Sequence, residues 1–329
     1  MMTGPIQGRI DGVLLDDWHV VCRSSDLREG QLSKARLLGE DLVIWRLGGK
    51  VNVWQDLCVH RGSRLSLGDL RDGLLTCAYH GWTYDGSGQC VRFPAHPDQR
   101  PPTTARVKTY RANEAYGLVW ACLGEPSKGI PTFHEWDDLS YRKIACGPYT
   151  YNASPARAVE NFLDVAHFPF VHGGLLGDEA HAEIEDYQVE SSIDGVTARN
   201  VRVWQPDPDG TGRGKTVTYT YGVLRPFTAR FTKSTDEGEF AIQLNVTPVD
   251  ENSCIGWMCI ALNYAADIPD GELRLYQDKI TGQDVPVVES QRPERLPLDL
   301  QAELHLRSDR IAVAYRKWLK QLSLSFGTV

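Results

Sequence analysis

The sequence predicts an α+β protein in two parts, an all-β N-terminal half and a second half that combines antiparallel strands with helices. The chain has 329 residues, which favours two domains or one large one over a single small module. Short apolar runs separated by turn residues fill the first half. Beyond about residue 148, longer alternating segments occur together with segments of helical spacing.

The strands expected in the first half lie between residues 31 and 123. They include LVIWRL, VNVWQD, LLTCAYH and YGLVWACL, separated by the turn signals GGK, RDG and DGSG. The Pro-rich stretch PAHPDQRPP predicts a surface loop, and GEP, KGIP and CGP follow between residues 124 and 148. We therefore expect one domain over residues 1–147 and a second over 148–329.

The second half begins with helical spacing from Pro155 to Phe168. The alternating segments VTYTYGVL, FAIQLNVT and CIGWMCIAL predict antiparallel strands. GELRLYQDKITGQDVPVVESQ and SDRIAVAYRKWLKQLSL predict helices, and Ser308 and Asp309 are placed to cap the second of them. The mixture makes this half α+β.

Composition and charge narrow the class of protein. The chain holds 35 Lys and Arg against 43 Asp and Glu, a formal net charge of -8, which argues against nucleic acid or an anionic membrane as the main partner. No run of 18 apolar residues exists, and the opening residues lack a basic segment followed by an apolar one, so we expect a cytoplasmic protein without signal or anchor. Eight cysteines are too dilute for a disulfide scaffold, so we expect reduced thiols, some of which can bind metal.

The most specific pattern is a double cysteine-histidine motif. Cys58-x-His60 is followed, after 16 residues, by Cys77-x-x-His80. Two such pairs on separate loops can hold one small cluster between them. With two thiolates on one iron and two neutral imidazoles on the other, the cluster is a Rieske [2Fe–2S] centre.

Two glycines near the motif are consistent with a cluster, and zinc is the alternative metal. Gly62 and Gly81 follow the two histidines and let backbone N–H groups approach the bridging sulfides. A tetrahedral zinc site uses the same ligand types, but it normally lacks a Cys and a His in each pair. We therefore favour the cluster and keep zinc as the alternative.

A second histidine pair lies in VENFLDVAHFPFVH. Asn161, Asp164 and His167 recur at steps of three, which predicts that they share one helical face. His172 lies five residues beyond His167, about 140° around an unbroken helix, too far for both to bind one ion. We expect Pro169 to end or kink the helix, so that His172 turns back. The alternative is a pair of hydrogen-bonded core histidines.

Two histidines need a carboxylate to complete the facial triad that holds non-haem Fe(II) with open positions. Asp284, which precedes PVVESQ, is our candidate. Asp284 could instead cap a helix that has Pro286 in its first turn. The spacing alone leaves both interpretations open.

The Cys-His block, with HRG and YHGW beside its ligands, resembles the Rieske non-haem iron oxygenases. The resemblance runs from DDWHVVC at 16–22 to AYRKWLKQL at 314–322. HFPFVH, ESQRP and SDRIAVAYRKWL look most like the branch of caffeine-type N-demethylases and saxitoxin-tailoring hydroxylases, with dicamba-type O-demethylases further off. The resemblance implies an all-β Rieske domain followed by a catalytic domain of antiparallel sheet plus helices, the helix-grip fold.

Site roles follow from the same resemblance. GQDVPVVESQRP resembles the family segment that supplies the carboxylate, so Asp284 is implied as the third ligand of a mononuclear Fe(II). Asp164 is implied to join His167 to His80 of a neighbouring subunit in a homotrimer. Asn161 is implied as an outer contact near the iron. A proton-balancing role and a solvated position remain equally open for Glu160.

The function implied is that of the oxygenase component of a monooxygenase. It would use O2, with electrons from an NAD(P)H-dependent reductase or ferredoxin, to hydroxylate a C–H bond of a small nitrogen heterocycle or alkaloid-like substrate. The alternative is an oxidative N- or O-demethylase that releases formaldehyde. A Rieske electron carrier or sensor without oxygenase activity is an alternative of a different class.

Overall fold

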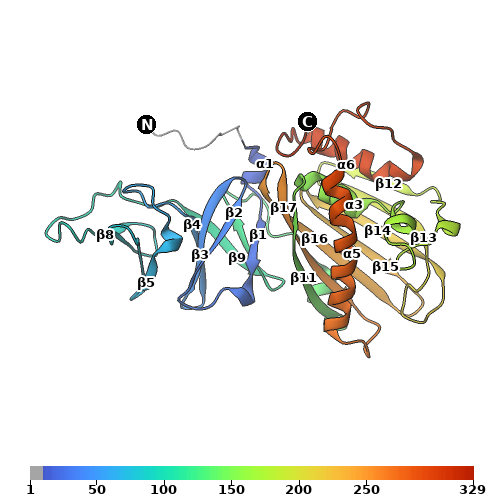
Figure 1. The fold of residues 1–329 in the computed structure, drawn as a ribbon, viewed down its shortest axis with the longest axis horizontal. Helices are drawn as coiled ribbons and strands as arrows, with labels where there is room; N and C mark the ends of the chain where they lie inside the picture. Colours follow the sequence, from blue (N-terminus) through green and yellow to red (C-terminus); the bar gives the residue numbers. More distant parts are fainter. Residues whose placement is uncertain (1–9) are drawn as a thin grey trace. The chain divides into compact units, whose positions relative to one another are not determined.

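The computed structural model describes residues 10–329 (Figure 1). Residues 1–9 lie outside the described residues, and both the expected first domain and the expectation of no leader include them. The chain forms two compact units, Leu14–Ile130 and a second unit of Pro131–Val329 joined by the described residues up to Val13. Each unit is described by itself below.

The expected boundary between residues 147 and 148 falls inside a strand, β11 (Arg142–Tyr151). This strand pairs with β17 (Ser253–Leu262) along its length, and the register shifts between Cys146 and Tyr149. The Gly-Pro pair that indicated a linker therefore forms a bulge in a paired strand. The structure divides near residue 130 instead.

The first unit is all-β, as expected, and contains two antiparallel sheets. The larger has the order β1-β10-β9-β4-β3-β2 and the smaller β5-β6-β7-β8. The strands are β1 (His19–Arg23), β2 (Leu32–Leu37), β3 (Glu40–Leu47), β4 (Lys50–Gln55), β5 (Asp69–Arg71), β6 (Leu74–Thr76), β7 (Thr83–Tyr84), β8 (Cys90–Arg92), β9 (Thr109–Ala115) and β10 (Leu118–Cys122), with short helices η1 (Ser24–Asp26) and η2 (Leu65–Leu67). The short helix α1 (Gly12–Leu15) includes the last residues before this unit begins at Leu14.

The core of the first unit joins both sheets. Trp45 and Trp54 of the β3–β4 hairpin meet edge to face, with ring centroids 4.5 Å apart. Cys58 and Cys77 belong to the same buried cluster and are each 2% exposed. The hydrophobic core therefore extends to the base of the two loops that carry the Cys-His motif.

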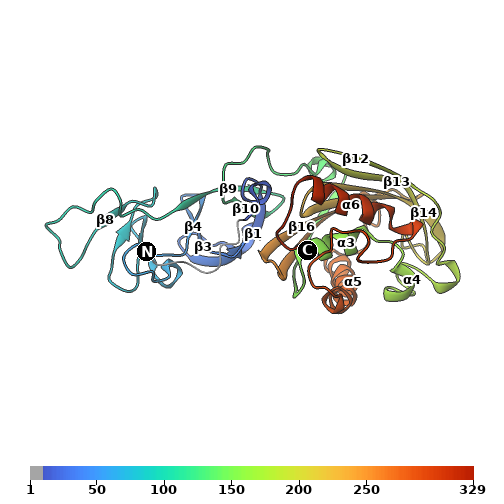
Figure 2. The ribbon, with the colours of Figure 1, turned by 90° about the horizontal axis from the view of Figure 1, so that it is seen from above.

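The second unit is a seven-stranded antiparallel sheet with its three longest helices over one face (Figures 1 and 2). Its strand order is β11-β17-β16-β15-β14-β13-β12. The remaining elements are α2 (His134–Asp137), α3 (Pro155–Leu163), α4 (Phe168–Val171), η3 (Glu179–His181), β12 (Gln188–Ser192), β13 (Gly195–Gln205), β14 (Lys215–Arg225), β15 (Thr228–Ser234), β16 (Glu239–Asp250), α5 (Asp270–Ser290), η4 (Arg307–Asp309) and α6 (Arg310–Gln321). The structure confirms the predicted α+β class of this half.

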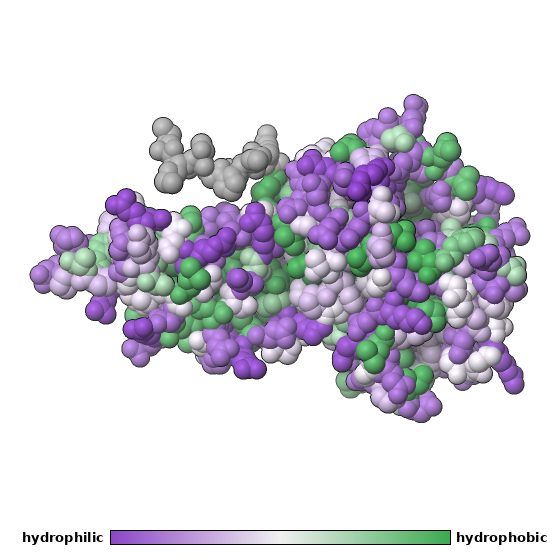
Figure 3. Space-filling model, in the orientation of Figure 1, coloured by the Kyte–Doolittle hydropathy of each residue, from purple (hydrophilic) through white to green (hydrophobic). Residues whose placement is uncertain are grey.

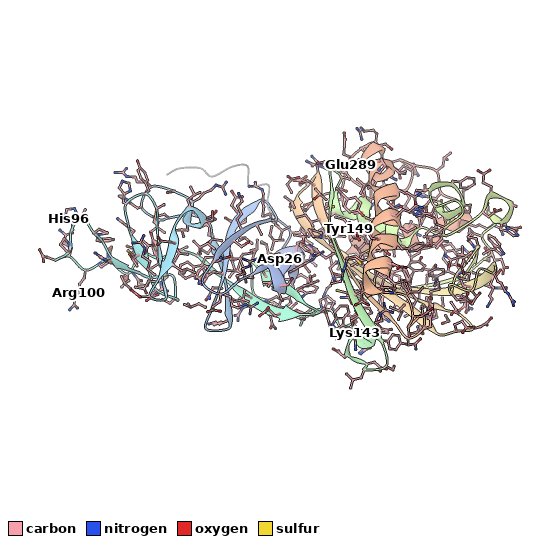
Figure 4. All side chains as sticks on the ribbon, turned by 60° about the horizontal axis from the view of Figure 1, so that its bottom comes forward. Asp26, His96, Arg100, Lys143, Tyr149 and Glu289 are labelled. Carbon is pink, nitrogen blue, oxygen red and sulfur yellow. The ribbon has the colours of Figure 1, made fainter. Side chains whose placement is uncertain are left out.

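Helix α5 packs on the edge strand β11, and two hydrogen bonds join its middle and its C-terminal end to the residues at and just after the end of that strand. The Tyr149 hydroxyl donates to Asp278 Oδ1 at 2.6 Å, and the Asn152 N–H donates to Glu289 Oε1 at 2.8 Å. Figure 4 labels Tyr149 and Glu289 beside this helix. These bonds hold in place the helix that carries Asp284.

Helix α6 is tied to α3 by a buried ion-pair network. The Arg316 guanidinium is 3% exposed and donates to both oxygens of Glu160, at 2.6 and 2.7 Å. Arg316 also donates to Glu303, which accepts from Arg157 of α3. Glu160 is therefore neither solvated nor part of the histidine cluster, because its carboxylate is used to join two helices.

The start of α6 differs from the expected cap. Asp309 occupies the cap position, but its carboxylate accepts from the Leu306 N–H at 2.7 Å and from the Ser308 hydroxyl. The side chain therefore stabilises the preceding turn rather than the first turn of the helix.

Polar and apolar side chains alternate over the face drawn in Figure 3. Across residues 10–329, no helix combines the length and the apolar character needed to cross a membrane.

Candidate metal centres

Two loops of the first unit share one backbone pattern. In the first, the Cys58 N–H donates to the carbonyl five residues on, and the Cys58 carbonyl accepts from Gly62. The second loop repeats both bonds from Cys77, whose carbonyl accepts from Gly81. Gly62 and Gly81 have φ of +70° and +68°, a conformation that suits glycine. The two loops therefore present their side chains in the same way.

The four motif side chains divide by exposure. Cys58 and Cys77 are buried, His60 is half-buried and His80 is exposed. The two imidazole rings lie with centroids 4.6 Å apart, and His60 stacks on Trp82 at 4.3 Å. The thiols thus lie at the base and the imidazoles at the tip.

A tyrosine that the motif did not indicate also contacts this site. The Tyr84 hydroxyl lies 3.0 Å from Cys58 Sγ, and Tyr84 is fully buried. Tyr84 is on strand β7 beyond the second loop, so only the fold brings it to the first loop. A hydroxyl there can donate to a metal-bound thiolate.

The buried ligand atoms of the two loops fit a bound metal centre. His60 Nδ1 is buried without a hydrogen-bond partner, as a metal ligand requires. Burial also raises the pKa of the Cys58 thiol, so the thiolate needs a cation beside it.

The histidine segment of the second unit is not one kinked helix. Helix α3 ends at Leu163, and Asp164 is extended, with φ -83° and ψ 131°. Pro169 lies in the first turn of a separate short helix, α4, so it starts a helix rather than ending one. The expected common helical face of Asn161, Asp164 and His167 is therefore wrong, although the segment still brings His167 to His172.

Three side chains converge at the end of this segment. His167 Nε2 and His172 Nε2 are 3.2 Å apart, and Asp284 Oδ1 lies 3.3 Å from the first and 3.0 Å from the second. Three ligands at ~2.1 Å from one ion and at right angles to one another would be ~3.0 Å apart. The three residues can therefore hold one face of an octahedral metal ion.

Asp284 does not cap a helix. Helix α5 begins at Asp270 and ends at Ser290, so Asp284 lies well inside it. Asp284 is 8% exposed, and its Oδ1 atom faces the Nε2 atoms of both histidines. A buried carboxylate oxygen beside two imidazole nitrogens is the donor set that a divalent iron ion accepts.

Each imidazole has a partner on its other nitrogen. Asp164 Oδ2 lies 3.3 Å from His167 Nδ1, and Gln283 Oε1 lies 2.9 Å from His172 Nδ1. An acceptor at Nδ1 favours the tautomer that leaves the Nε2 lone pair free for a metal. No sequence motif identifies Gln283 as a partner of His172. The only feature of the sequence that could have indicated it is its position directly before Asp284.

The charges of this site favour a cation. Burial opposes the charged form of His167, but hydrogen bonds to Asp164 and Asp284 outweigh it and raise the pKa of His167 to about 9. Burial alone would raise the pKa of Asp284, yet its bonds to His167 and His172 lower it. A metal ion must therefore displace a proton from His167 to bind.

A cavity of about 400 Å³ adjoins the three side chains. Its size lies within the range of small-molecule sites. Neighbouring strands supply two rows of its wall, Tyr221–Phe231–Ile242–Ile260 and Tyr219–Lys233–Phe240–Leu262. Asn161, His167, His172 and Asp284 also line the cavity, whereas Asp164 does not. The wall is mostly aromatic and aliphatic.

Replacing Gln283 by leucine should weaken metal binding by about 10- to 100-fold, because His172 loses the acceptor that orients its ring. Titration of the metal-free protein with Co(II), followed by its visible absorption, measures this affinity. Gln283→Glu keeps an acceptor and should bind the metal as the wild type does. Equal affinity of the leucine variant and the wild type would contradict the orienting role.

Comparison with known proteins gives two family matches along the chain. Residues 17–111 match the Rieske [2Fe-2S] domain. Residues 151–324 match the vanillate O-demethylase oxygenase C-terminal domain. The matches cover the two metal centres described above.

Individual relatives match either nearly the whole chain or about a third of it. The methylxanthine N1-demethylase NdmA of Pseudomonas putida is 31% identical over 93% of this chain and 88% of its own length. The structure of Pseudomonas putida CBB5 NdmA with caffeine has a TM-score of 0.80 and 29% identity over 94% of this chain and 90% of the other. The Pseudomonas putida oxidoreductase NdmD is 43% identical over 34% of this chain and 19% of its own length.

Proposed function

Because this chain belongs to the Rieske non-haem iron oxygenases, oxidoreductases with a [2Fe–2S] cluster and a mononuclear iron, we propose that it removes an N-methyl group from a small nitrogen heterocycle. The hydroxylation expected from the sequence is consistent with this family. Demethylation is the same hydroxylation at an N-methyl carbon. The cavity beside the three convergent side chains is the observation that carries the proposal.

The reaction balances as a two-electron monooxygenation. N–CH3, O2, two electrons and two protons give N–CH2OH and water. The C–N bond of this carbinolamine then breaks, so nitrogen keeps a proton and the carbon leaves as formaldehyde. When bound, the mononuclear iron supplies O2 activation, and the cluster supplies single electrons.

The chain's own residues take the following roles in the proposal. His167, His172 and Asp284 hold the iron on one face, and Asp164 and Gln283 fix the two rings through their Nδ1 atoms. Asn161 lines the cavity and serves as an outer contact. The cluster is held by the four residues of the Cys-His motif, Cys58, His60, Cys77 and His80. Their burial and contacts, given above, support these assignments.

The cavity wall supports a small, flat, largely apolar substrate. Aromatic side chains from adjacent strands offer stacking surface, with Tyr221 and Phe231 centroids 5.3 Å apart. Caffeine, which is bound in the NdmA structure, has this shape and carries N-methyl groups. A methylated heterocycle is therefore the substrate class that we propose.

Two partners belong to the proposal. Electrons come from an NAD(P)H-dependent reductase or ferredoxin, and the likeness to the oxidoreductase NdmD supports a partner of that kind. A homotrimer, in which Asp164 meets His80 of a neighbouring subunit, rests on the family resemblance. The Asp164 side chain is 37% exposed and His80 is exposed, so both are accessible within their own units.

The test is turnover by the iron-loaded protein with a reductase and NADH. We expect formaldehyde and oxygen uptake with N-methylated heterocycles such as caffeine, and about three irons per chain. A product that gains one oxygen without formaldehyde would favour hydroxylation of a ring or chain carbon. Two irons per chain without oxygen uptake would favour the electron carrier. Light scattering of the same sample tests the trimer.

A further inference from the structure

The cavity wall contains one buried cation. Lys233 lies on β15, in the row between Tyr219 of β14 and Phe240 of β16. It is 8% exposed, and among the described residues it is the only Lys or Arg that lines the cavity. An isolated ammonium on an aromatic wall is costly unless something accepts its hydrogen bonds.

Lys233 has more donors than the protein satisfies. Its Nζ atom donates to the Pro208 carbonyl at 2.7 Å and makes a long contact of 3.5 Å with Gln205 Oε1. The nearest aromatic face, Phe240, is 5.2 Å from Nζ. An ammonium has three N–H donors, so at least one has no acceptor among the residues described.

The carboxylates of the neighbouring loop are bound elsewhere. Asp209 Oδ2 accepts from Lys215 at 3.0 Å, and Asp209 Oδ1 accepts from Thr211 at 2.7 Å. No carboxylate of the described chain lies within 4.0 Å of Lys233 Nζ. Burial lowers the pKa of Lys233 to about 8, against the field of Asp209 and Asp207, so the amine is still mainly protonated at neutral pH.

A second donor faces the same space. Tyr221, in the adjacent row, is 1% exposed, and its hydroxyl is buried with no hydrogen-bond partner. The acceptors nearby are occupied, since Gln205 Oε1 faces Lys233 and the Tyr219 hydroxyl accepts from Gln205 Nε2 at 2.9 Å. The cavity therefore offers hydrogen-bond donors to a ligand, and its complement is a ligand with acceptors.

We propose that Lys233 is a specificity residue that binds a carbonyl-type oxygen of the substrate, either a ring carbonyl or a carboxylate. This proposal rests on the proposed function, because it assigns the cavity to the substrate, and it narrows the substrate class. A ring with carbonyl oxygens and no N–H donors, such as a fully N-methylated purinedione, complements this wall. A protonated amine is disfavoured because the two cations repel each other.

Direct binding tests the proposal without turnover. The iron-loaded full chain is titrated by calorimetry with two matched pairs of ligands. The first pair is caffeine and 1-methylbenzimidazole, which lacks ring carbonyls, and the second is 4-methoxybenzoate and 4-methoxytoluene. Lys233→Met should weaken binding of the favoured oxygen-bearing ligand by about 10- to 100-fold, because one charged hydrogen bond is lost. The ligand without that oxygen should change less than about 2-fold.

A matched lysine serves as the control variant. Lys143, labelled in Figure 4, is on β11 and does not line the cavity, so Lys143→Met should leave all affinities unchanged. Lys233→Gln keeps a neutral donor and should lose less affinity than Lys233→Met. Thermal melts and the visible spectrum confirm that each variant is folded and carries its cluster.

The results distinguish a ring carbonyl from a carboxylate as the group that Lys233 binds, and they can also contradict the proposal. Loss confined to caffeine identifies a ring carbonyl, and loss confined to 4-methoxybenzoate identifies a carboxylate. Equal loss for both members of each pair, no loss, or no wild-type binding of any ligand overturns the role of Lys233. If the affinity difference persists but no ligand yields formaldehyde, the demethylase proposal fails while Lys233 remains a ligand-binding residue.

Discussion

Asp284→Ala should remove nearly all turnover while the iron–sulfur cluster survives. We expect the rate to fall on the order of 1,000-fold or more, equivalent to about 4 kcal/mol of lost transition-state stabilisation. The reason is that the two imidazole nitrogens, 3.2 Å apart, lose the only carboxylate that converges on them in the described chain. Product analysis and iron content measure the effect, and iron should fall from about three to about two per chain.

Asp278→Ala is the matched control, because Asp278 lies on the same helix outside the cavity lining. Its loss removes one hydrogen bond from Tyr149 and should cost only about 1 kcal/mol of stability. The visible spectrum of both variants should match that of the wild type. Normal turnover by Asp284→Ala would remove Asp284 from the metal site.

Arg316→Met should destabilise the second unit by about 3–5 kcal/mol. The substitution removes the guanidinium that is 3% exposed and leaves the carboxylates of Glu160 and Glu303 without their main partner. In a unit of this size each 1 kcal/mol corresponds to a fall of roughly 2–4 °C in the melting temperature. Calorimetry and urea unfolding of the full chain measure the effect.

An exposed ion pair provides the comparison. Arg310 lies on the same helix and bonds Asp186 at 3.3 Å with 42% of its side chain exposed, so Arg310→Met should cost about 1 kcal/mol or less. A loss below about 1 kcal/mol for Arg316→Met would show that the network contributes little to stability.

The same network should make stability depend on acid pH. Burial acts to raise the pKa of Glu303, but the bonds from Arg157 and Arg316 outweigh it and lower that pKa below its ordinary value of 4.5. The stability that Glu303 contributes is therefore present above pH 4.5 and is lost as the pH falls through the lowered pKa. Arg316→Met should lose part of this acid dependence, and urea midpoints between pH 3 and 6 would show it.

The sequence pattern placed the end of helix α3 too late, at Phe168 instead of Leu163. Val165 and Phe168 continue the apolar spacing of α3, so the pattern favours a helix to residue 168. In the structure, Asp164 Oδ1 accepts from the Ala166 N–H at 2.7 Å, a local bond that competes with the helix. The apolar residues are buried all the same, because the break turns the segment rather than exposing it.

Some residues contact the candidate sites but belong to no sequence motif, so the sequence alone could not predict their contacts. Tyr84 reaches Cys58 across 26 residues, Gln283 reaches His172 across 111, and Lys233 reaches Pro208 across 25. Each contact depends on how strands and helices pack. Nothing in the local sequence around these residues distinguishes them from ordinary core or helix positions.

The amino-acid sequence alone determined the α+β class, the strand-rich first half, the Cys-His motif and the His167 and His172 pair, because periodicity and ligand spacing are local properties. Spacing left the role of Asp284 open, and only the resemblance to a family implied it as the third ligand. Tertiary structure alone decided that Asp284 meets His167 and His172, that the Gly147–Pro148 pair is a bulge, and that Lys233, with no carboxylate of the described chain within 4.0 Å, lines the cavity. These features join residues far apart in the chain, and only the packing of helices on the sheet brings them together.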